Sequence, residues 1–402
     1  MGGGLSSPKV AIVTNSLYGG VWTSARFVME TLERSGRFEY DVISVATSAH
    51  DEASVRILDP RSWRRGIRVI EQQMNGVKAR HVGAQFTELE TQRYRPRKTL
   101  TNLLDKYDLV QVVSGTPPLM HVTAHSTMPK ALLVASRTTV ERATVLKQAK
   151  GLSALFRRLM AHAVSRMEAD ALRTADVVFV LNKWMEEYAI KEISAARTIF
   201  APPGIDTAFW WPQPYQPDGY ILCVGRLADP RKNIPLLLTA YRQLLDMSDT
   251  APRLVLAGRT APSADTMAHL EQLGLSDRVE IIVNPSLERL RSIYQHAAMF
   301  VLSSDEEGLG LVILEAMACG IPVVSTDSGG PATLIDNHVT GIMTPVGDAE
   351  ALANTMRELL ADPKRRAQMG EAGRKRAEHE LSLEATGDLY LAKYDELLQS
   401  KA

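Results

Sequence analysis

The sequence contains few cysteines and no excess of charge of either sign. Only two of the 402 residues are cysteines, Cys223 and Cys319, and both lie in apolar stretches. Two isolated cysteines form neither a disulfide framework nor a zinc site, which favours a reducing cytoplasm. The 46 basic and 46 acidic side chains cancel. This balance argues against a nucleic-acid-binding protein, because such proteins usually carry a basic excess.

Long hydrophobic runs are also missing. The longest apolar stretches, such as VVFVL and MFVL, are the length of strands and well short of the roughly 18 residues that span a bilayer. The opening residues MGGGLSSP lack the apolar run behind a basic start that defines a signal peptide. We therefore expect a protein in the cytoplasm, either soluble or at the inner face of the membrane.

The neutral total hides an asymmetry between the two halves. Residues 1–210 carry 28 Lys and Arg against 20 Asp and Glu, a balance of +8, and residues 211–402 carry 18 against 26, a balance of −8. Two halves of opposite sign suggest two domains with different partners, the first of which faces an anionic molecule. The alternative is that a balance of this size is ordinary variation.

Short β-branched runs alternate with longer helical patterns along the whole chain. Two series of strands are predicted: 10–14, 40–46, 109–113, 131–136, 177–181 and 198–201, then 220–224, 253–257, 279–283, 299–303 and 322–325. Apolar strands separated by helix-length segments predict parallel sheets covered on both faces. A proline-rich segment at 202–218 separates the two series. The sequence therefore predicts two doubly wound α/β domains, with ligands bound at the carboxyl ends of their strands, in the cleft between the domains.

The segment SSDEEGLGLVILEAMACGIPVVSTDSGG, residues 303–330, carries the strongest chemical signal. Behind a predicted strand come Glu307, the turn Gly308-Leu309-Gly310, and a helix that contains Glu315. Glycines let the backbone approach a ligand closely, and the free amides at a helix start can bind phosphate. Glu315 could then accept hydrogen bonds from a vicinal diol such as a ribose, and Glu307 could hold the hydroxyls of a sugar.

Two cations follow the first strand of the second series, in ILCVGRLADPRKN. Arg226 lies just beyond the strand, and Lys232 lies six residues later at the start of the next helix. Two cations beside the amide-rich end of a helix can neutralise a diphosphate and support its departure as a leaving group. The alternative, that they are solvated surface charges, suits Lys232 better than Arg226.

Residues 219–330 closely resemble the donor domain of retaining glycosyltransferases of family four, the glycogen-synthase-like GT-B group. The family's VGRL and KN patterns stand as Val224–Leu227 and Lys232-Asn233, and its pair of glutamates separated by seven residues stands as Glu307 and Glu315. PPGID in the linker, GIMTPVGD at 341–348 and the terminal helix also resemble the family. A match of this density is far more specific than a lone glycine motif.

The resemblance implies a GT-B fold of two Rossmann-like domains that face a central cleft. It places an acceptor-binding domain at 1–205, a linker at 206–218, a donor-binding domain at 219–385, and a helix at 386–402 that returns to the first domain. It assigns the donor diphosphate to Arg226 and Lys232, the ribose to Glu315, and the sugar and phosphate to Glu307 with the backbone of Gly308, Leu309, Gly310 and Leu311. The family needs no metal, and the chain contains no Asp-x-Asp motif. We therefore expect no metal and no cofactor.

The first half resembles the family less closely. Gly19 and Gly20 follow the first strand, as does the glycine pair with which the family contacts the donor. After the strand ALLVAS, however, the family's histidine is missing, and Ser136 and Arg137 stand there instead. Arg137 is the preferred substitute near the reaction centre. His121 or His125 are the alternatives.

Basic residues of the first half have two possible meanings. A helix predicted over 152–174 has an apolar stripe with arginines largely off it, which is typical of a core-facing helix and also of one lying on a membrane. Arg61, Arg64, Arg65 and Arg68 surround Trp63, which could mark an anionic acceptor or a lipid. Together with Arg93, Arg95, Arg97 and Lys98 they would suit a phosphate-bearing acceptor, or a solvated face.

These observations predict a retaining, metal-independent glycosyltransferase that uses a UDP- or GDP-linked hexose. Its acceptor would be a cell-envelope glycan or a lipid-linked saccharide, with a small molecule as the alternative. We expect no nucleic-acid partner and leave open a peripheral association with a membrane. The missing histidine motivates a second hypothesis, a non-catalytic nucleotide-sugar-binding homologue or scaffold subunit. An epimerase or phosphorylase on the same architecture has no specific sequence support.

Overall fold

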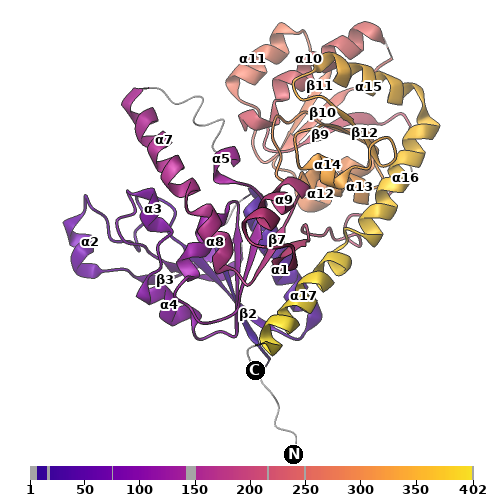
Figure 1. Cartoon of the computed structure of the whole chain (residues 1–402). Coiled ribbons are helices and arrows are strands. Elements are labelled where there is room, and N and C mark those ends of the chain that lie inside the picture. The colour runs from indigo at the N-terminus through magenta and orange to yellow at the C-terminus, as the bar shows by residue number, and fades with distance from the viewer. Residues whose placement is uncertain are drawn as a thin grey trace, which may run out of the picture. The chain divides into compact units, whose positions relative to one another are not determined.

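The computed structural model describes residues 7–15, 19–74, 76–141, 151–214, 217–248 and 250–400. The chain divides into two compact units. Unit 1 consists of Met1–Pro203 and Thr386–Ala402, and unit 2 consists of Gly204–Ala385. Figure 1 shows unit 1 mainly in indigo and magenta and unit 2 in orange shades, each with strands at its centre and helices around them.

Unit 1 is built on a mainly parallel sheet. Its strands are β1 (Lys9–Thr14), β2 (Glu39–Val45), β3 (Val69–Met74), β4 (Val77–Val82), β5 (Leu109–Ser114), β6 (Lys130–Val134), β7 (Val177–Val180) and β8 (Thr198–Phe200). They lie in the order β3-β4-β2-β1-β5-β6-β7-β8. Every pair is parallel except β3 with β4, which is antiparallel and joins Val69 to Val82.

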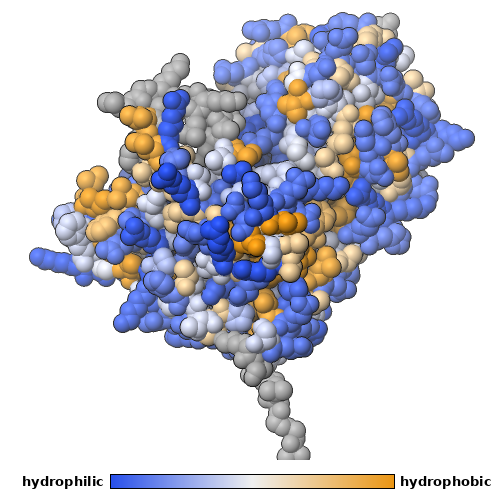
Figure 2. Space-filling model, viewed as in Figure 1, coloured by the Kyte–Doolittle hydropathy of each residue, from blue (hydrophilic) through white to orange (hydrophobic). Residues whose placement is uncertain are grey.

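The helices of unit 1 follow the strands. They are α1 (Gly19–Ser35), α2 (Pro60–Arg65), α3 (Glu90–Arg93), α4 (Lys98–Leu104), the 3₁₀ helix η1 (Pro117–Thr123), α5 (Thr138–Glu141), α7 (Gly151–Ser165), α8 (Glu168–Thr174), α9 (Lys183–Glu192) and η2 (Ala195–Arg197). The face of the protein in Figure 2 is mainly hydrophilic, and hydrophobic patches stand out beside α2 and on α7. Among the described residues, no helix is both long enough and apolar enough to cross a bilayer.

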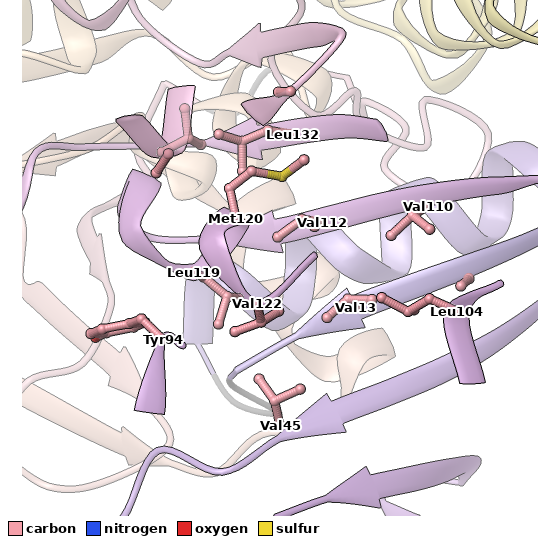
Figure 3. Packing of buried hydrophobic residues seen from close by; sticks show 14 of the residues in the cluster. Val13, Val45, Tyr94, Leu104, Val110, Val112, Leu119, Met120, Val122 and Leu132 are labelled. Carbon is pink, nitrogen blue, oxygen red and sulfur yellow. The ribbon is translucent and has the colours of Figure 1, made fainter. Parts of the chain in front are cut away.

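The core of unit 1 forms where helices cover the sheet. Val13, Val112 and Leu132 from β1, β5 and β6 pack with Leu119 and Met120 of η1, as Figure 3 shows. These side chains are almost completely buried. The central strands are apolar on both faces, which is what a parallel sheet covered on both sides requires.

The final helix, α17 (Leu383–Gln399), packs into unit 1 although unit 2 separates it in the sequence from the rest of that unit. The ring of Tyr390 stacks on that of Phe179 with centroids 3.9 Å apart. The hydroxyl of Tyr390 donates to the carbonyl oxygen of Ala201 at 2.8 Å, and that of Tyr394 donates to Oε1 of Gln111 at 2.6 Å. Both tyrosines are fully buried, and their hydroxyls are satisfied, as buried polar groups must be.

Unit 2 is a second doubly wound domain. Its strands are β9 (Tyr220–Val224), β10 (Leu254–Gly258), β11 (Val279–Val283), β12 (Ala297–Leu302), β13 (Val323–Thr326) and β14 (Gly341–Thr344). Its helices are η3 (Pro230–Lys232), α10 (Ile234–Met247), α11 (Ala264–Gln272), α12 (Leu287–Gln295), α13 (Leu311–Ala318), α14 (Pro331–Leu334), α15 (Ala349–Ala361) and α16 (Pro363–His379). The sheet order is β11-β10-β9-β12-β13-β14, and all its pairs are parallel.

The structure differs from the sequence-based prediction at four elements. Strands β3, β4 and β14 were not predicted. The pair β3 and β4 is rich in polar residues (VIEQQM and VKARHV) because it forms an edge of the sheet, so it lacks the apolar run of a buried strand. The helix predicted over 152–174 is two helices, α7 and α8, separated at Arg166 and Met167.

Candidate functional site

Two turns at the carboxyl ends of neighbouring strands form the centre of the site in unit 2. One turn follows β9 and contains Arg226 and Lys232, and the other follows β12 and contains Glu307. Because β9 and β12 pair in parallel, both turns leave the same edge of the sheet. The amide of Asp305 donates to the carbonyl oxygen of Arg231 at 2.8 Å, and the hydroxyl of Ser303 donates to that of Lys232 at 3.0 Å.

Lys232 and Glu307 form an ion pair across these two turns. The Lys232 ammonium donates to Oε1 of Glu307, and each side chain is only 11% exposed. The hydroxyl of Ser304 donates to the same carboxylate oxygen at 2.8 Å. Burying a charge to this extent without a partner has a large free-energy cost. The pair therefore places a cation and an anion side by side at the edge of the sheet.

Arg226 lies in a more open position. Its side chain is 57% exposed and its Nη2 lies 2.9 Å from Oδ2 of Asp229. Arg231 also binds that carboxylate, at 3.0 Å. Burial alone would raise the pKa of Asp229, but hydrogen bonds from Arg231 and the charge of Arg226 outweigh it and hold that pKa below its usual value. Asp229 therefore stays ionised and orients the Arg226 guanidinium, which remains accessible to an anion.

The glycine turn before α13 depends on close backbone contacts. Gly310 is the N-cap of α13 and has a φ of 87°, a left-handed conformation that favours glycine. The amide of Glu307 donates to the carbonyl oxygen of Ser328, and the amide of Gly330 donates back to that of Glu307, both at 2.9 Å. A Cβ on Gly330 would lie 2.6 Å from the backbone nitrogen of Leu309. The Gly329-Gly330 pair thus allows the backbone of residues 308–310 to lie against it at the start of α13. The first amides of a helix have no acceptor one turn earlier in the helix.

Glu315 lies on α13 and has its own partner. The hydroxyl of Tyr294 on α12 donates to Oε2 of Glu315 at 2.7 Å. Burial raises the pKa of Glu315 to about 7, although the hydrogen bond from Tyr294 lowers it in part. Tyr294 is fully buried and packs edge-on against Trp210, with ring centroids 5.6 Å apart. The carboxyl group is therefore positioned from one side, and at neutral pH it is close to half ionised.

Gly19 and Gly20, at the carboxyl end of β1, begin helix α1 in unit 1. Both are exposed, and a Cβ on either would meet nothing within 4 Å. Gly19 has a φ of 65°, which explains glycine there. The first turn of α1 contains no acidic residue, which leaves its positive end uncompensated. Tyr18, which precedes the pair in the motif, lies outside the described residues.

Arg137, the predicted substitute for the family's histidine, lies just after β6. Its Nε lies 3.5 Å from Oε2 of Glu168, and its guanidinium lies 4.1 Å from the centroid of the Tyr188 ring. Glu168 is completely buried and also accepts the amide hydrogen of Thr138. A carboxylate buried beneath the guanidinium and a ring against it fix the direction of Arg137.

The alternative histidines are placed differently. His121 lies in η1 and is half-buried, and burial lowers its pKa, although the charge of Asp170 raises it in part. His125 is exposed in the following turn. Neither imidazole ring makes a hydrogen bond with another residue that the structure describes, and of the three side chains Arg137 is the one that follows β6.

The arginines of the first half do not form one solvated face. Arg97 is buried, and its Nη1 donates to the carbonyl oxygens of Arg93 and Arg95. Arg93 donates to the carbonyl oxygens of Thr87 and Thr47, which tie two loops together. Part of the basic excess therefore stabilises the backbone of unit 1. The Arg61–Arg65 segment, by contrast, is exposed apart from Ser62.

Sequence reasoning missed the residues that support the site. Tyr294 positions Glu315, Asp229 orients Arg226, and Glu168 holds Arg137. Ser304 could have been found, because it lies three residues before Glu307 in the same motif. No local pattern marks Tyr294 or Glu168, because each meets its partner only through the tertiary structure.

Comparison with known proteins matches part of the chain to a family. Residues 206–376 match the family model described as glycosyl transferases group 1. This segment is 171 of the 402 residues, and the match confirms the resemblance to group 1 glycosyltransferases drawn from residues 219–330.

Characterised relatives match about half of the chain. A GDP-mannose-dependent alpha-(1-6)-phosphatidylinositol monomannoside mannosyltransferase of Mycolicibacterium smegmatis is 34% identical over 221 residues, which is 50% of this chain and 57% of the relative. A D-inositol 3-phosphate glycosyltransferase of Gordonia bronchialis is 30% identical over 225 residues, 52% of this chain and 49% of the relative. The chain thus spans about half the length of these relatives.

Solved structures match over nearly the whole chain. Sucrose-phosphate synthase of Thermosynechococcus elongatus has a TM-score of 0.70 at 23% identity and covers 98% of this chain and 100% of its own. The Anabaena protein HepE, solved in complex with UDP and glucose, has a TM-score of 0.69 at 15% identity and covers 96% and 99%. The predicted fold is confirmed: the chain has the GT-B fold, with two parallel-sheet α/β domains.

Proposed function

We propose that this protein is a retaining, metal-independent glycosyltransferase that transfers a hexose from a UDP- or GDP-sugar to an acceptor hydroxyl. The observation that carries the proposal is the Lys232–Glu307 ion pair beside the glycine turn of α13, at the carboxyl edge of the unit 2 sheet. A cation, a carboxylate and the amides at the start of a helix are the groups that recognise a phosphate next to a sugar.

Each residue of the unit 2 site has a role in this proposal. Arg226 and Lys232 neutralise the donor diphosphate, and the backbone of Gly308–Leu311 binds its oxygens. Glu307 holds hydroxyls of the sugar, and Glu315 accepts hydrogen bonds from the ribose. Lys232 and Glu307 form an ion pair with each other. On donor binding, the diphosphate would interact with Lys232 and the sugar with Glu307.

The reaction would replace one bond to the anomeric carbon by another on the same face of the sugar. The bond from that carbon to the diphosphate oxygen breaks, and the bond to the acceptor oxygen forms. The acceptor proton passes to the leaving phosphate, whose charge Arg226 and Lys232 stabilise. Arg137, fixed by Glu168 and Tyr188, would donate hydrogen bonds near the reaction centre.

The names of the relatives suggest where to begin with substrates. One is GDP-mannose-dependent and acts on a phosphatidylinositol monomannoside, and another is named for D-inositol 3-phosphate. GDP-mannose is therefore the first donor to test. An acceptor that bears phosphate, such as a lipid-linked saccharide or a cell-envelope glycan, fits the balance of 28 basic against 20 acidic residues in 1–210.

A second candidate is a non-catalytic homologue that binds a nucleotide sugar as a scaffold or partner subunit. It is favoured by one observation: the family's histidine is replaced by Arg137, and this side chain is committed to Glu168 and Tyr188. A cation paired within unit 1 could stabilise a charged ligand without taking part in transfer.

The test is a panel of nucleotide sugars with the full chain, in buffer containing EDTA, following release of UDP or GDP. Calorimetry with the same donors measures binding separately. We expect one donor to bind and to be turned over, and Arg226→Ala to lower turnover by roughly a hundredfold. Arg253→Ala, which changes an exposed arginine at the amino end of β10, is the matched control.

The outcomes separate the two candidates. Turnover that EDTA leaves unchanged supports a metal-independent transferase, and transfer of the sugar with its anomeric configuration kept supports retention. Tight binding without turnover across phosphate-bearing and neutral acceptors supports the non-catalytic homologue. Absence of binding to every UDP- and GDP-sugar at millimolar concentration refutes both.

A further inference from the structure

The turn that leads into α2 exposes large hydrophobic side chains among arginines. Leu58 is 83% exposed and Trp63 is 57% exposed, and Ile57 beside them is also exposed. Arg61, Arg64 and Arg65 occupy the same turn and helix and are exposed too. We call these six residues the α2 surface. Figure 2 shows hydrophobic atoms standing out beside α2, with hydrophilic ones around them.

Hydrogen bonds and a ring contact hold the α2 surface in a defined conformation. The indole Nε1 of Trp63 donates to the carbonyl oxygen of Arg56 at 2.7 Å, and its ring meets that of Phe86 edge-on. The amides of Ile57 and Leu58 donate to the Glu88 carboxylate at 3.0 and 3.3 Å. These polar groups are already satisfied within the protein. The apolar side chains can therefore leave water without leaving those donors unpaired.

The charge around these side chains is positive. Residues 56–68 contain five arginines and one acidic residue, Asp59, and the Glu88 carboxylate on the amides of Ile57 and Leu58 adds a second negative charge. Asp59 pairs with Arg65, whose Nη2 lies 3.2 Å from its carboxylate. In the part of the chain that the structure describes, Arg61 and Arg64 have no carboxylate within ion-pair distance. A surface that combines uncompensated arginines with Trp, Leu and Ile is complementary to a layer that is anionic outside and apolar beneath.

We propose that the α2 surface docks on an anionic lipid bilayer. Leu58 and Trp63 enter the boundary between headgroups and acyl chains, and Arg61 and Arg64 bind lipid phosphates. The positive charge favours a bilayer over a purely apolar protein partner, and the satisfied indole and amides allow the shallow insertion that a bilayer needs. This inference does not depend on the nucleotide-sugar site, because it uses only residues of unit 1 that are far from that motif in the sequence.

The first test is flotation of the full chain with two kinds of vesicle, phosphatidylcholine alone and phosphatidylcholine mixed with phosphatidylglycerol. We expect binding only to the mixed vesicles, weakened by high salt because salt screens the arginines. Arg61→Ser with Arg64→Ser should weaken binding about thirtyfold, from the contribution expected of two basic residues at an anionic surface. Leu58→Ser, which changes a side chain that is 83% exposed and so leaves the core intact, should weaken it about tenfold.

Matched controls come from unit 2. Arg253→Ser with Arg357→Ser removes two exposed arginines, and Leu287→Ser removes an exposed leucine. Both should bind mixed vesicles as the unmodified chain does. A second readout is quenching of tryptophan fluorescence by lipids brominated on their acyl chains. Part of this quenching should disappear in Trp63→Phe, which keeps an apolar ring but removes the indole.

Three results would overturn the proposal. The first is no binding to phosphatidylglycerol vesicles. The second is binding that the α2 variants leave unchanged, which would move the contact elsewhere. The third is sedimentation without vesicles that shows a dimer dissolved by Leu58→Ser, because the α2 surface would then cover a second copy of the chain. Failure of nucleotide-sugar binding would leave all three results unaffected.

Discussion

The hydroxyl of Tyr294 lies 2.7 Å from Oε2 of Glu315, and the two side chains come from the neighbouring helices α12 and α13. Glu315 is the residue to which we assign the ribose, and its pKa is raised to about 7, mainly by burial. An ordinary glutamate would ionise near 4.5. Because burial raises this pKa, the stability of the free protein depends on pH.

The first prediction concerns stability. In the folded chain Glu315 keeps its proton up to about pH 7, whereas in the unfolded chain it loses it near 4.5. Unfolding is therefore favoured as the pH rises between these values, and Glu315 costs about 3 kcal/mol above pH 7 compared with acidic pH. Glu315→Gln should stabilise unit 2 by up to this amount at pH 8 and much less at pH 4.5. Denaturant titrations at the two pH values measure this, and a difference independent of pH would contradict it.

The second prediction concerns donor affinity. A ribose diol donates hydrogen bonds, so it binds the ionised carboxylate of Glu315 better than the protonated acid. The dissociation constant of the nucleotide sugar should rise by up to about tenfold per pH unit below pH 7 and level off above it. Calorimetry from pH 5.5 to 8.5 measures this, with Glu315→Gln as control, because that variant should bind weakly at every pH. A slope that persists in Glu315→Gln would assign the titration to another group.

A third prediction follows from the ion pair of Lys232 and Glu307. Each side chain is 11% exposed, so removing one partner leaves the other charge buried. Lys232→Met should destabilise unit 2 by about 3 kcal/mol. The double variant Lys232→Met with Glu307→Gln should recover most of that loss and still fail to bind donor. A double-mutant cycle of unfolding free energies checks this, and purely additive effects would show that the two side chains are not coupled.

Arg226 should behave differently from Lys232, because it is exposed and Asp229 is its one ion-pair partner among the described residues. Arg226→Ala should change the free energy of unfolding by less than about 0.5 kcal/mol. Turnover should nevertheless fall by roughly a hundredfold, because the variant lacks a charge that stabilises the leaving diphosphate. Chemical denaturation and a nucleotide-release assay measure the two quantities on one preparation. Loss of stability in parallel with activity would mean that Arg226 has a structural role.

Arg137 is expected to act on transfer and not on donor binding. Arg137→Gln should leave the dissociation constant of the nucleotide sugar unchanged and lower turnover by roughly a hundredfold. Arg173→Gln, also in unit 1 and paired with Asp170 at 2.9 Å, should leave both unchanged. Equal turnover in Arg137→Gln and the unmodified chain would remove Arg137 from the reaction centre.

The backbone at Gly330 leads to a prediction about donor binding. Its Cβ would lie 2.6 Å from the nitrogen of Leu309, so Gly330→Ala should displace the turn before α13 and weaken donor binding. Gly373→Ala on α16 is the control, because its Cβ would make an ordinary contact of 3.4 Å with Met317. That control should stabilise the helix by about 0.5–1 kcal/mol. Unchanged donor affinity in Gly330→Ala would show that the turn tolerates displacement.

Much of the fold could be predicted because buried parallel strands are apolar runs. Strands β9 and β11 begin and end where the sequence predicts them. The edge pair β3 and β4 could not be found in this way, since one of its strands reads VKARHV and lacks a continuous apolar run. The residues of the unit 2 site could be predicted from the sequence because they lie in two short motifs. Glu168, by contrast, lies 31 residues after Arg137 and meets it only once β6 and α8 have packed.

The stacking of Tyr390 on Phe179 has a consequence for biosynthesis. Unit 1 takes its first segment from Met1–Pro203 and its second from Thr386–Ala402, and the whole of Gly204–Ala385 is translated between them. During translation, unit 2 can be complete before Tyr390 and Tyr394, which pack against Phe179, have been synthesised. The first segment therefore lacks α17 throughout that interval, and Phe179 gains its stacking partner only when the last segment has been synthesised.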